Sequence, residues 1–242
     1  MTLNEFEEKD FHLKGTSHIL HLPLRLLLIL FISALNLAST IPFIYKWQES
    51  GKLISTTSAS ANIPGILAQN LITSAFSILI FIIFLLILKR RFANEMYLKV
   101  KGKIPFITVL ALVVILMAFT IYCLITKQDK ITVLYNLFYY VFFIAFFEEF
   151  IFRDVFPFLL KDEKSVIRYL VPGIMFGIVH LFNYSGWQNL SAEYIIQFFT
   201  AKFLGLVVSS FIFQFMKEKS GTIWIPVLMH AIMDYSCILK LN

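Results

Sequence analysis

Long apolar runs alternate with short polar segments along almost the whole chain. Most of these runs reach the length of about 20 residues that a helix needs to cross the hydrocarbon core of a bilayer. The pattern predicts an all-α fold, a polytopic transmembrane helical bundle of about seven spans. The expected spans are residues 24–45, 66–88, 104–126, 133–160, 169–182, 194–216 and 221–239.

Polarity also divides the chain into three parts. Residues 1–22 are polar and carry four carboxylates against two lysines, whereas a cleavable signal would begin with a short basic region. We expect this segment to be cytoplasmic and the first span to be retained. Residues 23–126 then hold three N-terminal transmembrane helices, and residues 127–242 hold a four-helix core in which we expect the active site.

Composition strengthens the membrane assignment. Of the 242 residues, 59% are hydrophobic and only 15% are charged, which lies outside the usual range of soluble domains. We therefore predict an integral membrane protein of the cell membrane, with the lipid bilayer as its main partner. The net charge of +6 is no sign of nucleic acid binding, because the basic residues cluster at the ends of the apolar runs.

The basic residues also predict the orientation of the helices. Cytoplasmic segments of membrane proteins are enriched in lysine and arginine. With the N-terminus inside, the inner segments carry fourteen such residues and the outer segments carry five. Lys217 and Lys219 are counted here as residues of the sixth connecting loop. The bias predicts a multi-pass protein with a cytoplasmic N-terminus.

The fourth apolar run contains three charged residues, Glu148, Glu149 and Arg153. On insertion scales, each charge at the centre of a transmembrane helix costs roughly 2.5 to 3.5 kcal/mol. Such residues are kept where they pair with each other or line a polar site. The cluster therefore predicts a functional site within the membrane.

Two other predicted spans carry ionisable residues at a similar depth. His180 lies in the fifth span, and His230 lies with Asp234 in the seventh. At about 1.5 Å per residue, Glu148, His180 and His230 each lie about 14 to 20 Å from the cytoplasmic end of their helix. Equal depth allows the three side chains to converge, as one catalytic site would require.

Helical spacing separates the roles of these residues. Adjacent residues diverge by about 100° around a helix, whereas residues four apart share a face. We therefore assign Glu149 and Arg153 to a structural ion pair and leave Glu148 free for chemistry. His230 and Asp234 are also four apart, so we treat them as one unit in which the carboxylate orients the imidazole.

A metal site is an alternative use of the same side chains. Glu148, His180, His230 and Asp234 would together provide a ligand shell for zinc or another divalent metal, with an open position for water. The chain has no HExxH motif, so such a site would be assembled across helices. Spacing alone does not decide between a metal and a metal-free mechanism.

Three motifs follow one another on hydrophobic helices: EExxxR at residues 148–153, FxxxH at residues 176–180 and HxxxD at residues 230–234. In this order they resemble the CPBP intramembrane proteases, the CAAX-protease and bacteriocin-processing group that includes the Ras-converting CAAX endopeptidases. The resemblance covers about residues 133–239 and does not extend to the first three spans.

The resemblance implies hydrolysis of a peptide bond within or beside the membrane, by an endopeptidase of metallo or metal-free type. It implies that Glu148 and His180 activate the attacking water, and that His230 and Asp234 stabilise the oxyanion or orient the site. It also implies that the ion pair between Glu149 and Arg153, in the first motif, has a structural role. Part of the family has asparagine at the last motif position. Asp234 makes a second acidic metal ligand conceivable and argues against an amide oxyanion donor.

The expected function is therefore an intramembrane endopeptidase that acts on a hydrophobic or membrane-associated peptide, in bacteriocin processing or self-immunity. One alternative is a non-catalytic immunity protein that binds such a peptide in the same place. Another is a proton-coupled transporter, because intramembrane carboxylates and histidines also build proton relays. The order of the motifs favours the protease.

Overall fold

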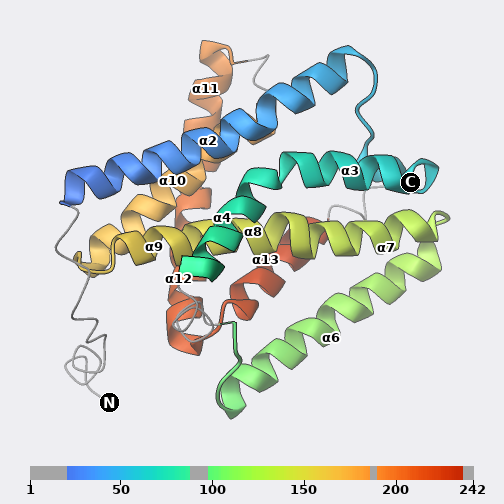
Figure 1. Ribbon diagram of the computed structural model, residues 1–242. Helices are drawn as coiled ribbons and strands as arrows, with labels where there is room; N and C mark the ends of the chain where they lie inside the picture. The colour runs from blue at the N-terminus through green and yellow to red at the C-terminus, as the bar shows by residue number, and fades with distance from the viewer. Residues whose placement is uncertain (1–20, 88–97, 186–189, 237–242) are drawn as a thin grey trace.

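The computed structural model describes residues 21–87, 98–185 and 190–236, and within these ranges it consists of helices joined by short loops, without strands (Figure 1). Residues 1–20 of the predicted N-terminal segment, and residues 88–97 of the basic loop after the second span, lie outside the described residues. The longer helices are α2 (Leu22–Glu49), α3 (Ile63–Thr73), α4 (Ala75–Ile87), α6 (Lys103–Thr126), α10 (Ser165–Ser185), α12 (Leu204–Ser220) and α13 (Trp224–Tyr235). The predicted all-α fold is confirmed.

Five helical stretches in the described ranges are long and apolar enough to cross a membrane: Leu22–Glu49, Lys103–Thr126, Lys130–Leu159, Ser165–Phe182 and Ala192–Ser220. A sixth is formed if α3 and α4 are one span with a bend of 59°. The seventh predicted span, 221–239, corresponds in its described part to α13, which has 12 residues, and residues 237–239 lie outside the described residues. The expectation of about seven spans is thus roughly consistent with the structure.

The second span is not the single helix that the sequence predicted for residues 66–88. It is broken at Ser74 into α3 and α4. The backbone at the break is supported by α2, because the hydroxyl of Thr40 donates to the carbonyl oxygen of Thr73 at 3.0 Å. A hydrogen-bond partner from another helix compensates a carbonyl whose helical partner is lost, so the bend is tolerated in an apolar run.

The helix that carries the carboxylates is a continuous run of 30 residues. It is composed of α7 (Lys130–Phe138), η2 (Tyr139–Phe146), α8 (Phe147–Glu149), η3 (Phe150–Val155) and α9 (Phe156–Leu159), of which η2 and η3 are π-helical. Wide π-helical turns are rare and occur often at functional sites. Here they lie on both sides of the short α8, which carries Glu148 and Glu149.

Glycine allows α10 to approach the next membrane helix closely. A Cβ atom on Gly177 would lie 2.6 Å from the ring of Phe203, and one on Gly173 would lie 3.2 Å from the ring of Phe211. Phe203 ends the π-helical segment η5 (Phe199–Phe203), which joins α11 (Ala192–Phe198) to α12. Small residues four apart thus let aromatic rings pack directly on the α10 backbone.

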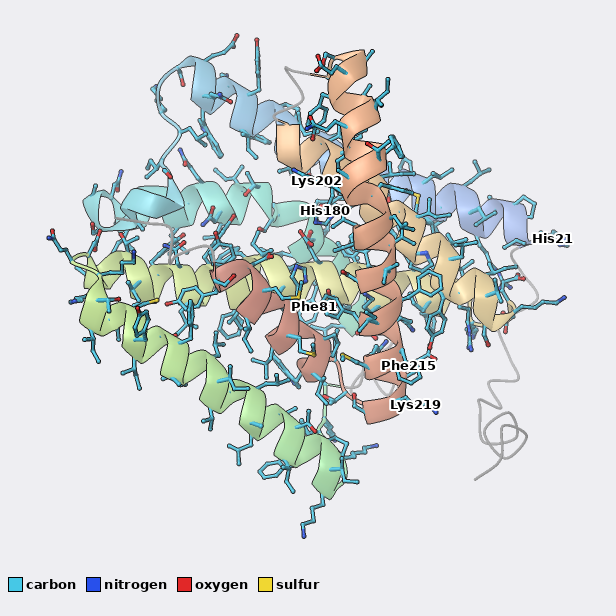
Figure 2. All side chains as sticks on the ribbon, turned by 180° about the vertical axis from the view of Figure 1, so that it is seen from behind. His21, Phe81, His180, Lys202, Phe215 and Lys219 are labelled. Atoms are coloured by element: carbon cyan, nitrogen blue, oxygen red, sulfur yellow. The ribbon has the colours of Figure 1, made fainter. Side chains whose placement is uncertain are left out.

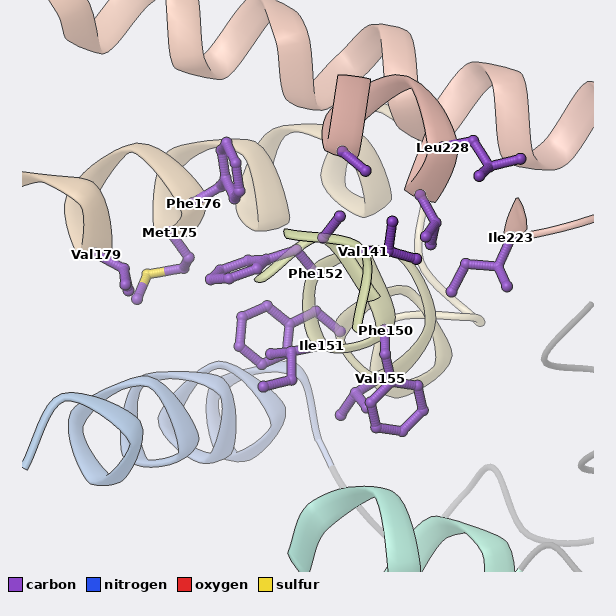
Figure 3. Packing of buried hydrophobic residues seen from close by; sticks show 14 of the residues in the cluster. Val141, Phe150, Ile151, Phe152, Val155, Met175, Phe176, Val179, Ile223 and Leu228 are labelled. Carbon is purple, nitrogen blue, oxygen red and sulfur yellow. The ribbon is translucent and has the colours of Figure 1, made fainter. Parts of the chain in front are cut away.

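The apolar core surrounds the helix that carries the carboxylates. Phe150, Val155 and Phe156 on this helix are fully buried, as is Tyr235 on α13. Figure 3 shows apolar side chains of this helix, of α10 and of the chain around α13 meeting in one cluster. The carboxylates therefore project from a rigid, apolar framework.

The helix α12 crosses the carboxylate-bearing helix, as the view from behind shows (Figure 2). Lys217 lies within α12 rather than in a loop, and it is 4% exposed. Its ammonium group forms an ion pair with Asp154 and donates to the carbonyl oxygen of Arg153 at 2.5 Å. Counting Lys217 among the loop charges was therefore wrong, because it compensates a buried carboxylate.

Candidate active site

The two adjacent glutamates of α8 lie at the centre of the site but differ in exposure. The side chain of Glu149 is completely buried, whereas that of Glu148 is 21% exposed. Glu149 Oε2 lies 3.1 Å from Nε of Arg153, whose side chain is also completely buried. Glu148 is thus the carboxylate that can meet a substrate, and Glu149 lies behind it.

His180 reaches Glu148 from α10. Its Nδ1 donates a hydrogen bond of 2.8 Å to the carbonyl oxygen of Phe176, one helical turn earlier. This bond fixes the ring and leaves Nε2 to face the site. Nε2 lies 3.6 Å from Oε2 of Glu148, beyond direct hydrogen-bond distance but within reach of a shared water.

His230 on α13 has carboxylates on both sides of its ring. Its Nδ1 donates to Oε1 of Glu149 at 2.8 Å. Its Nε2 lies 3.3 Å from Oδ2 of Asp234 and 3.9 Å from Oε2 of Glu148. The structure therefore brings together all four residues to which the sequence assigned catalysis, and it adds Glu149 as the partner of His230.

The site has a sealed side and an accessible side. Arg153 and Glu149 form the sealed side, together with the ring of Phe176, whose centroid lies 4.6 Å from the guanidinium carbon. Asp234, with 38% of its side chain exposed, and Glu148 form the accessible side. Glu148 thus lies between the buried charges and the accessible side of the site.

Residues 130–236 match the family model described as type II CAAX prenyl endopeptidase Rce1-like. This segment is therefore similar to the Rce1-like family. Comparison with curated proteins and with solved structures gave no match. The Rce1-like segment runs from the first residue of α7 to the residue after α13, so it contains all four candidate catalytic residues.

The match confirms the resemblance to the CPBP proteases that the three motifs indicated. The family that this segment matches is described as an endopeptidase, so the match indicates a membrane protease at the level of the family. The helices before residue 130 lie outside the matched range.

The candidate ligands of the Rce1-like segment do not form a metal-binding group as they stand. Over residues 21–87, 98–185 and 190–236, no three or more His, Cys, Asp or Glu side chains are placed so that they could hold one ion. His230 uses Nδ1 for Glu149 and has Asp234 beside Nε2.

Two contacts of the Rce1-like segment were missed by sequence reasoning. The bond from His230 to Glu149 joins residues 81 positions apart, so helical spacing could not predict it. The pair between Lys217 and Asp154 had a signal in the sequence, because a carboxylate next to Arg153 on the same helix needs a buried cation.

Proposed function

We propose that the protein is an intramembrane endopeptidase in which a water activated by Glu148 and His180 hydrolyses a peptide bond. The observation that carries this proposal is the position of the Glu148 carboxylate. The side chain is partly exposed, while its Oε2 atom is buried and lies within 4 Å of the Nε2 atoms of both His180 (3.6 Å) and His230 (3.9 Å). The similarity of residues 130–236 to the Rce1-like family supports the reaction class.

In this mechanism, Glu148 is the general base. It takes a proton from the water as the water oxygen attacks the carbonyl carbon, and it returns the proton to the leaving amine when the carbon–nitrogen bond breaks. His180 orients the water. Because its Nδ1 donates to the Phe176 carbonyl, Nε2 of the neutral ring accepts a hydrogen bond from the same water.

His230 and Asp234 act on the other side of the substrate carbonyl. Negative charge develops on the carbonyl oxygen in the transition state, and a fixed N–H group directed at it lowers the barrier. The Nδ1 bond to Glu149 holds the His230 ring, and Asp234 beside Nε2 keeps a proton on that nitrogen. His230 then stabilises the oxyanion, and Asp234 orients His230.

The substrate that suits this site is a hydrophobic or membrane-associated peptide that enters from the bilayer. A prenylated CAAX peptide is one form, after the description of the family. A bacteriocin precursor is another, which would place the protein in bacteriocin processing or self-immunity. We place the protein in the cell membrane with a cytoplasmic N-terminus, and labelling of single cysteines from either side tests that orientation.

The proposed function is tested by cleavage of a peptide panel with purified protein in detergent. The panel holds prenylated CAAX peptides, the same peptides without the prenyl group, and bacteriocin precursors, and mass spectrometry identifies the products. We expect internal cleavage of at least one peptide by the wild-type protein and no cleavage by His180→Ala. Peptide binding without cleavage by the wild-type protein would contradict the proposal and favour the immunity protein.

Metal removal tests the metal-free form of the mechanism. Because no step uses a metal ion, we expect the cleavage rate to stay at the wild-type value after prolonged treatment with a strong zinc chelator. The control is an unrelated zinc protease treated in parallel. If the chelator abolishes cleavage and added zinc restores it, the metal-free mechanism is wrong, although the protease assignment stands.

A further inference from the structure

An aromatic side chain from α12 covers one face of the His230 imidazole. The ring of Phe213 lies 5.7 Å from the imidazole, between centroids, with 28° between the two planes. Phe213 is 4% exposed. None of the three sequence motifs includes this residue or any other residue of α12. This helix nevertheless contacts the site directly.

The same phenylalanine also lies beside Arg153. The guanidinium carbon is 5.8 Å from the centroid of Phe213 and 4.6 Å from that of Phe176. Among the described residues, neither terminal nitrogen of Arg153 has a hydrogen-bond acceptor. The negative faces of the two rings therefore stabilise the buried cation.

Arg153 and His230 are thus joined in two ways. Glu149 joins them through polar contacts, at 3.1 Å to the guanidinium and 2.8 Å to the imidazole. Phe213 joins them through its ring, which contacts the guanidinium and stacks on the imidazole. The first connection fixes one atom of the imidazole, and the second restricts the plane of the ring.

The plane of the imidazole matters for the proposed reaction. The hydrogen bond at Nδ1 and the covalent bond at Cγ still allow the ring to tilt, and such a tilt moves Nε2. In the structure Nε2 lies 3.3 Å from Asp234 and 3.9 Å from Glu148. We infer that Phe213 is a positioning residue, whose ring holds the His230 imidazole so that Nε2 faces the reacting carbonyl. This role rests on the proposed function.

The kinetic test compares three variants of α12. Phe213→Leu removes the aromatic face and keeps an apolar side chain, and Phe213→Tyr keeps the face. Phe215→Leu is the matched control, because Phe215 lies two residues further along α12, is 53% exposed and has its ring near Lys219 (Figure 2).

We expect Phe213→Leu to lower kcat about 10- to 100-fold with KM unchanged, which is the cost of a small misplacement of a catalytic group. Phe213→Tyr keeps most of the wild-type kcat, and Phe215→Leu keeps all of it. The inference is overturned if Phe213→Leu keeps the wild-type kcat. It is equally overturned if Phe215→Leu loses as much, since the loss would then reflect general packing of α12.

A second measurement does not depend on cleavage. In protein with isotope-labelled histidine, the ring protons of His230 are identified by their loss in His230→Gln. The stacked ring of Phe213 shields them, so Phe213→Leu moves their signals downfield and Phe215→Leu leaves them in place. If the wild-type protein cleaves no peptide, the proposed function fails while this readout still decides the position of Phe213. Unchanged signals in Phe213→Leu would refute the contact.

Discussion

Glu148 and Glu149 are adjacent residues whose carboxylates have opposite surroundings. Glu148 is partly exposed and faces His180, whereas Glu149 is sealed between Arg153 and His230. A carboxylate that acts as a general base needs access to water. A carboxylate that forms a buried ion pair is shielded from water. The pair therefore combines a reactive group with a group that holds the site together.

Removing the charge of Glu149 should destabilise the protein strongly. Glu149→Gln leaves the guanidinium of Arg153 buried without its anionic partner, and loss of one member of a buried ion pair costs about 3–5 kcal/mol. We expect this decrease in the free energy of unfolding, measured by reversible unfolding of the purified protein in detergent.

The double variant Glu149→Gln/Arg153→Met provides the control. It removes both charges, so it should be more stable than Glu149→Gln alone, and the two substitutions should be strongly non-additive. Additive effects would show that the two side chains do not stabilise each other.

Helical spacing predicted the contact between Glu149 and Arg153, because it depends on one helix only. It also separated Glu148 from Glu149. It could not show that both carboxylates reach the same imidazole, since His230 comes from another helix and its two nitrogens face different sides. Contacts of this kind depend on how the helices pack against each other, and this packing cannot be predicted from a single sequence.

At the scale of elements, the carboxylate-bearing helix changes its winding around the site. The π-helical segments η2 and η3 lie directly before and after α8. The backbone near η3 gains support from α12, where Lys217 donates to the Arg153 carbonyl. Sequence periodicity predicted one uniform helix over residues 133–160, because an apolar run of this kind does not distinguish α-helical from π-helical turns.

The beginning of this helix depends on Asp129. Its carboxylate accepts hydrogen bonds from the backbone N–H of Thr132 at 2.9 Å and from the hydroxyl of Ser60, which lies in η1 (Thr56–Ala61). Loss of an N-cap costs about 0.5–2 kcal/mol. We expect Asp129→Ala to lower Tm at neutral pH, measured by thermal unfolding in detergent, and Asp129→Asn to lower it less because asparagine also caps helices.

The contribution of Asp129 should depend on pH in one direction. The hydrogen bond from Ser60, followed by those from Thr132, lowers the pKa of this carboxyl below its ordinary value. Its stabilising effect is therefore present above the unfolded-state pKa of about 4 and is lost as pH falls through the folded-state pKa. The Tm difference between wild type and Asp129→Ala should shrink in acid, and a constant difference would contradict the charged cap.

For the molecule as a whole, the Rce1-like segment and the helices before it are joined at a defined contact. Arg25 near the start of α2 is 8% exposed and pairs with Asp162 at 3.0 Å and Glu163 at 3.7 Å, in the loop that precedes α10. The contact attaches the first helix to the part of the chain that carries the site. The sequence predicted the spans and the motifs, but not this attachment.

The bend between α3 and α4 has a similar explanation. The apolar run around Ser74 reads as one span, and the partner that supports the bend, Thr40, lies on α2. The site was more predictable than these contacts, because burying Glu148, His180 and His230 in apolar helices is costly and therefore conspicuous in the sequence. The bend and the contacts between helices carry no such cost of burying ionisable groups, so they are seen only in the structure.

The central claim is that Glu148 is the general base of an intramembrane endopeptidase. The most direct measurement is kcat/KM for a cleaved peptide with Glu148→Gln, which keeps the shape of the side chain and removes its basicity. The matched control is Glu193→Gln, at an exposed carboxylate in the first turn of α11. The account predicts a loss of about 10²- to 10⁴-fold for Glu148→Gln and none for the control. Cleavage by Glu148→Gln at the wild-type rate would contradict it.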